Sequence, residues 1–85
     1  MGKYSEAKYY FEKALKYEPL FAQAHNNLGL TYFALEYYSE AVAEYEKAIE
    51  CDPKYSAAYN NLGLLYSKLD NIDRALEAYK KAVAL

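Results

Sequence analysis

Apolar and small residues recur along this chain at the spacing of an α-helix. One set follows that spacing at His25, Leu28, Gly29, Tyr32 and Leu35. A second set repeats the same intervals at Tyr59, Leu62, Gly63, Tyr66 and Leu69. Because residues three and four positions apart share one face of a helix, each set forms a single apolar stripe. The pattern therefore predicts two amphipathic helices, over residues 22–35 and 56–69.

Three further stripes of the same kind lie before, between and after these two helices. They begin at Ala7, Ala41 and Ala75. The helices that they predict span 5–17, 39–51 and 73–85. Pro19 and Pro53 disfavour helical backbone at the residue before them, which ends two of these helices. Ser5, Ser39 and Asp73 are the expected N-caps, since their side-chain oxygens can accept a backbone N–H of the first turn.

The stripes belong to a longer internal repeat with an offset of 34 residues, which carries residue 26 to residue 60. The segment Asn26-Asn27-Leu28-Gly29-Leu30 recurs as Asn60-Asn61-Leu62-Gly63-Leu64. At the same offset, Tyr45 corresponds to Tyr79 and Pro19 corresponds to Pro53. A fixed period of this length is typical of helical repeat proteins, in which each unit packs on its neighbours.

The spaced residues resemble the signature of the tetratricopeptide repeat (TPR) family. They are His25, Leu28, Gly29 and Tyr32, followed by Ala41, Tyr45, Ala48 and Pro53. The resemblance implies an all-α fold, an α-solenoid of about five helices arranged as antiparallel pairs in a right-handed superhelix. It divides the chain into a second-helix half repeat (1–19), a full repeat (20–53) and a near-full repeat (54–85).

Small residues of the signature mark places where two helices approach closely. Gly29 and Gly63 are expected to leave room for the rings of Tyr45 and Tyr79 beside them. The sequence departs from the family at the turn between paired helices. Glu36 and Asp70 stand there, where the family often has glycine.

The resemblance implies that the first helix of each repeat lines a concave groove, which binds a protein or peptide segment. The groove residues expected on 22–35 are Gln23, Asn26, Asn27, Leu30 and Phe33. Those expected on 56–69 are Ala57, Asn60, Asn61, Leu64 and Lys68. The positions at which related domains grip a chaperone carboxylate hold no basic residue, so a carboxylate clamp is not expected.

Asn27 and Asn61 are the most specific candidates in this groove. A side-chain amide offers both a donor and an acceptor, which suits an extended peptide backbone. Two such amides, one repeat apart, could hold main chain without selecting a side chain. The alternative is that both residues are solvated, or bond to a neighbouring helix.

A second hypothesis is self-association, including a possible homodimer, through the ends of the solenoid. A solenoid end without a capping helix exposes apolar surface. The side chains concerned are Phe11, Leu15, Val83 and Leu85. The alternative is a monomer with frayed ends.

Composition and single residues exclude other classes of function. The net charge is −2 with acids and bases interspersed, which favours neither nucleic acid nor a membrane surface as a partner. No nucleophile–base pair, phosphate loop or metal-ligand cluster is present in the sequence, so we expect no enzyme, cofactor or metal.

Several single residues are expected to have structural roles. The only cysteine, Cys51, is expected to fill a small apolar space. One unpaired cysteine is also compatible with a reducing compartment, so we expect a cytoplasmic protein. His25 is expected to be a core histidine. A group of charged residues is expected to form solvated helix faces: Glu44, Glu46, Lys47, Glu50, Glu77, Lys80 and Lys81.

Overall fold

The computed structural model describes residues 2–17 and 21–85, without the side chains of residues 2, 15 and 17. These ranges form five helices and no strand, which confirms the predicted all-α class. The helices are α1 (Gly2–Tyr17), α2 (Ala22–Ala34), α3 (Tyr38–Cys51), α4 (Ser56–Lys68) and α5 (Ile72–Ala84). Pro53 follows closely after α3, as expected, and Pro19 lies outside the described residues.

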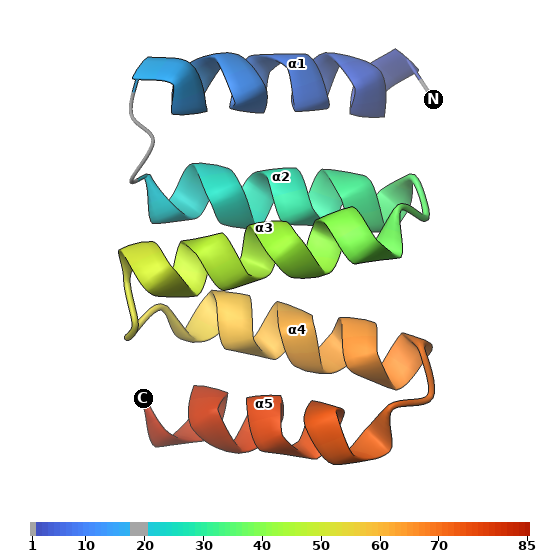
Figure 1. The fold of residues 1–85 in the computed structure, drawn as a ribbon, viewed down its shortest axis with the longest axis vertical. Helices are drawn as coiled ribbons and strands as arrows, with labels where there is room; N and C mark the ends of the chain where they lie inside the picture. Colours follow the sequence, from blue (N-terminus) through green and yellow to red (C-terminus); the bar gives the residue numbers. More distant parts are fainter. Residues whose placement is uncertain (1, 18–20) are drawn as a thin grey trace.

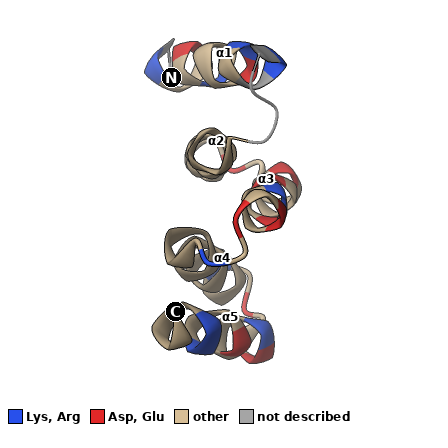
Figure 2. Ribbon diagram, turned by 90° about the vertical axis from the view of Figure 1, so that its left-hand side faces the viewer, with Lys and Arg blue, Asp and Glu red and all other residues tan. Residues whose placement is uncertain are grey.

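Neighbouring helices run antiparallel and stack along one axis of the molecule (Figure 1). α2 pairs with α3 and α4 pairs with α5, while α1 packs on α2 and α3 packs on α4. Figure 2 shows that α2 and α4 lie on one side of this stack and α3 on the other. The solenoid therefore has two different faces, one formed by α2 and α4 and the other with α3 at its centre (Figure 2).

The core lies between the paired helices and is built from small residues around a few large ones. Tyr45 on α3 is only 1% exposed, and burial raises its pKa to about 12. Ala41 and Ala48 flank it on the same helix and are fully buried. From α4, Leu65 enters this cluster without any exposed surface. Burying one leucine side chain contributes roughly 1.5–3 kcal/mol, so α4 is held firmly on the first helix pair.

Both signature glycines lie directly against a tyrosine ring, as the spacing predicts. A Cβ atom placed on Gly29 would come within 2.6 Å of Cε1 of Tyr45. A Cβ on Gly63 would come equally close, at 2.6 Å, to Cε1 of Tyr79. A separation this short is well inside van der Waals contact, so any side chain at these positions would push the paired helices apart.

The turns between paired helices have left-handed backbone at residues that are not glycine. Glu36 has φ 64° and Asp70 has φ 62°. The N–H of Glu36 bonds to the carbonyl of Phe33, and the N–H of Tyr37 bonds to that of Tyr32. This is the Schellman pattern that ends a helix, in which glycine is preferred at the left-handed residue. The departures from the family signature therefore carry a conformational cost.

The predicted N-caps were wrong: α1 begins before Ser5, and the Schellman turns before α3 and α5 pass straight into those helices. Ser5, Ser39 and Asp73 all lie inside helices, and the actual caps of α3 and α5 are Tyr37 and Asn71. The Asn71 side chain accepts from the N–H of Arg74 at 3.4 Å, which gives α5 a side-chain cap that the sequence pattern did not indicate.

Replacing Gly29 by alanine should destabilise the fold by about 1–2 kcal/mol, because the clash outweighs the better helix propensity of alanine. The matched change Gly63→Ala should cost less, since Tyr79 is only half-buried, on a helix packed from one side, and its ring can shift. Urea unfolding followed by circular dichroism measures both. Equal losses would show that the exposure of the opposing ring does not matter.

Replacing Glu36 by glycine should stabilise the fold by about 1 kcal/mol, because left-handed backbone penalises a residue with a Cβ atom. Asp70→Gly should gain less, since aspartate adopts this conformation more readily than glutamate. Glu36→Ala serves as the control and should give no gain. A melting temperature unchanged in Glu36→Gly would contradict the assignment of strain to this turn.

Candidate binding surface

The outer surface of α2 and α4 carries most of the residues predicted to line a groove. The two helices lie side by side and run in the same direction (Figure 1). Leu30 on α2 is 42% exposed, and its repeat equivalent Leu64 on α4 is 53% exposed. The other exposed members of the predicted set are Gln23, Ala57, Asn60 and Lys68. This outer surface therefore presents two apolar side chains, one per repeat, surrounded by polar ones.

The two candidate asparagines differ in their surroundings. Nδ2 of Asn61 donates to Oδ1 of Asn26 at 3.0 Å, which joins α4 to α2 across the repeat boundary. Asn26 was predicted to line the groove and is instead buried, because α4 covers it at this contact. Asn27 is half-buried, and its backbone carbonyl accepts from the hydroxyl of Thr31. The side chain of Asn61 thus connects two repeats, while that of Asn27 makes no such bond among the described residues.

Phe33 also departs from its predicted place. It is half-buried, packs against the core cluster and meets the ring of Tyr38 edge-on, with 5.7 Å between ring centroids. The periodicity of α2 alone puts Phe33 on the outer face, but its side chain packs toward the core because it contacts the ring of Tyr38 on α3. We therefore assign Phe33 to packing.

The predicted self-association residues at the α5 end are exposed. Val83 on α5 is 87% exposed, and Leu85 is also exposed. Leu76, which was not predicted, lies on the same helix and is exposed as well. Phe11 on α1 is half-buried, and the side chain of Leu15 lies outside the described residues.

A buried polar pair links α2 to α3. His25 is buried, as predicted, and its Nδ1 donates to Oε1 of Glu44 at 2.8 Å. Nζ of Lys47 lies 3.4 Å from the other carboxylate oxygen. Glu44 was predicted to lie on a solvated face and is only 8% exposed, so that prediction was wrong. A carboxylate at this depth needs such partners, because an unpaired buried charge is strongly unfavourable.

The described ranges hold neither a cluster of metal-ligating side chains nor a helix with the length and apolar character needed to cross a bilayer. The exposed groups of α2 and α4 include leucine, amide and lysine side chains, which suit contact with another molecule.

Comparisons with known proteins agree with this architecture. A family model described as tetratricopeptide repeat matches residues 1–56, and a second with the same description matches residues 44–77. A crystal structure of MamA superimposes with a TM-score of 0.92 and 29% sequence identity. The alignment covers 96% of this chain and 48% of MamA, so the chain spans about half the length of that protein. No curated protein sequence matches the chain.

Replacing Glu44 by alanine should destabilise the fold by about 2 kcal/mol, because it removes the acceptor that His25 uses in the core. Glu44→Gln retains an acceptor and should lose less. Glu46→Ala, at an exposed position of the same helix, is the matched control and should change stability by no more than about 0.5 kcal/mol. If Glu44→Ala and Glu46→Ala had the same free energy of unfolding, the buried pair would contribute nothing.

Proposed function

Because this chain belongs to the tetratricopeptide repeat family, we propose that it holds a segment of a partner protein along the outer surface of α2 and α4. Proteins of this family generally mediate protein–protein interactions and are generally not enzymes. In this proposal residues 20–53 and 54–85 each supply one helix pair. Residues 1–19 are a half repeat and supply only the second helix of a pair.

The observation that carries the proposal is the exposure of Leu30 and Leu64 at equivalent positions of two parallel helices. Burying apolar surface contributes about 25 cal/mol per Å², so covering both leucines would drive association. Their fixed spacing on a packed scaffold suits a partner segment with apolar side chains at a matching interval. Because the helices are already ordered, little conformational entropy is lost on the side of this chain.

The polar groups beside the leucines would orient such a segment. Asn27 can donate to and accept from the partner backbone, and Gln23 and Asn60 offer the same groups nearby. Asn61 is a weaker candidate than the sequence indicated, since its amide is engaged with Asn26. Lys68 adds a positive charge at the end of α4, which favours an acidic residue at that end of the segment.

Self-association is a second candidate, supported by the exposed side chains of α5. Leu76 and Val83 lie two turns apart on one helix and are both exposed. A second copy could cover them without using Leu30 or Leu64. The two candidates therefore involve different surfaces and can be separated by substitution.

The test selects peptides from a phage-displayed random library on the chain and measures their affinity by fluorescence anisotropy. Leu30→Asp combined with Leu64→Asp should weaken binding at least about tenfold, because both apolar contacts are lost. Leu76→Asp combined with Val83→Asp is the control and should leave peptide affinity unchanged. Selected peptides that bind the Leu30/Leu64 variant as tightly as the parent chain would refute the proposed surface. Sedimentation of the same variants shows whether α5 mediates self-association.

A further inference from the structure

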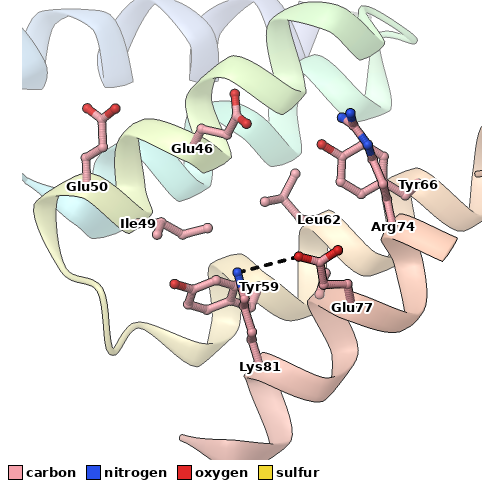
Figure 3. A pocket seen from close by; sticks show the side chains of 10 residues that line it. Glu46, Ile49, Glu50, Tyr59, Leu62, Tyr66, Arg74, Glu77 and Lys81 are labelled. Atoms are coloured by element: carbon pink, nitrogen blue, oxygen red, sulfur yellow. Dashed lines mark ion pairs between the residues drawn. The ribbon is translucent and has the colours of Figure 1, made fainter.

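A furrow runs between α3 and α5, on the side of the molecule away from Leu30 and Leu64. A first cavity in this furrow has a volume of about 590 Å³ (Figure 3). Tyr59, Leu62 and Tyr66 of α4 form the floor. A second cavity, of about 690 Å³, continues along the start of α3 and shares Tyr66 and Arg74 with the first. The furrow therefore extends along much of the second repeat.

The two repeats differ at one pair of positions that line the first cavity. At the offset of 34 residues, Tyr59 corresponds to His25 and Ala78 corresponds to Glu44. In the first repeat the Glu44 side chain reaches His25 and fills this place with a hydrogen-bonded pair. In the second repeat Ala78 is too short to do so. The second repeat therefore has a cavity lined by Tyr59 and Ala78 at the positions where the first repeat has a buried polar pair.

The two positive charges of the α5 wall differ in their surroundings: Lys81 has a carboxylate partner, and Arg74 contacts an aromatic ring. Nζ of Lys81 lies 3.9 Å from Oε1 of Glu77 and 5.9 Å from the centroid of the Tyr59 ring. The guanidinium of Arg74 lies 5.8 Å from the centroid of the Tyr66 ring. A ring contact stabilises a cation but leaves its charge in place, so Arg74 remains a positive group in both cavities. The two linings together still hold more acidic side chains (Glu36, Glu40, Glu46, Glu50 and Glu77) than basic ones (Arg74 and Lys81).

The carboxylates of the α3 wall are not paired with any cation of the described residues. Glu46 and Glu50 are one helical turn apart at the rim, and neither forms an ion pair within the described ranges. Glu36 and Glu40, which line the second cavity, are also without ion pairs there. Like charges one turn apart repel each other, and a cation between them relieves that repulsion. Ile49 lies between the two rim carboxylates and points with Leu62 toward the cavity (Figure 3).

We propose that this furrow is a second binding site, for a partner segment that carries lysine or arginine next to apolar side chains. A basic side chain lies between Glu46 and Glu50, and a neighbouring apolar side chain rests on Ile49 and Leu62. Charge complementarity and the apolar floor favour this occupant over an acidic one. The site goes beyond the proposed function, since it uses the opposite face and can be filled while α2 and α4 hold another segment.

The test titrates the ¹⁵N-labelled chain with the capped peptide KLGKLGKL and, separately, with ELGELGEL. The basic peptide should shift the amide signals of residues 46–50 and 59–66 at low ionic strength. Added salt should weaken its binding, because salt screens the attraction between the charges. The acidic peptide should not shift them. Similar shifts with both peptides, shifts confined to the α2 and α4 surface around Leu30 and Leu64, or no shifts would each overturn the proposal.

Substitutions then test whether Glu46 and Glu50 bind the basic side chains of the peptide. Glu46→Gln combined with Glu50→Gln should raise the Kd of the basic peptide about fivefold, since two exposed ion pairs are lost. Glu6→Gln combined with Glu12→Gln on α1 changes the net charge equally and is the matched control, expected to leave the Kd nearly unchanged. An equal loss in both double variants would show attraction to overall charge and would overturn the assigned site. Leu30→Asp with Leu64→Asp should not alter this titration, which separates its failure from that of the proposed function.

Discussion

The close approach of paired helices, glycine against tyrosine, is the constraint on which the rest of the structure depends. Gly29 lets α2 come close enough to α3 for the Tyr45 ring to be buried between them. Once that ring is fixed, α3 presents a defined surface on which Leu65 of α4 can pack. Gly63 then repeats the contact with Tyr79 of α5. Each helix therefore packs on the helices next to it in the sequence, so the stack follows the order of the chain.

The glycine–tyrosine contact is the same in both repeats, but the side chains beside it differ. His25 and Glu44 form a buried hydrogen bond in the first repeat, whereas the equivalent residues of the second repeat, Tyr59 and Ala78, line a cavity. The glycine–tyrosine contact is alike in both, so the helices keep their spacing while the side chains around them change. Repeat proteins can acquire a new surface in this way, because a substitution between helices alters one unit and leaves the packing of the others intact.

The sequence predicted well what depends on a single helix or on the repeat. The five helices and the packing of Gly29 follow from periodicity and register. It failed for side chains whose partners come from another helix. Glu44 looks like a surface residue on α3 until His25, 19 residues earlier, supplies a buried partner. Asn26 looks exposed on α2 until Asn61, 35 residues later, covers it. Such contacts depend on tertiary geometry that helical spacing does not contain.

Helical geometry makes α4 the element that links the two proposed sites. Leu64 points to the outer surface shared with α2, while Tyr59, Leu62 and Tyr66 face the furrow. Side chains on opposite sides of one helix cannot compete for the same partner, so two segments can bind at once. Both sites also depend on the position of α4, which Leu65 and the bond between Asn61 and Asn26 hold in place. A displacement of α4 would move both sites together, whereas small side-chain adjustments at one site would leave the other unchanged.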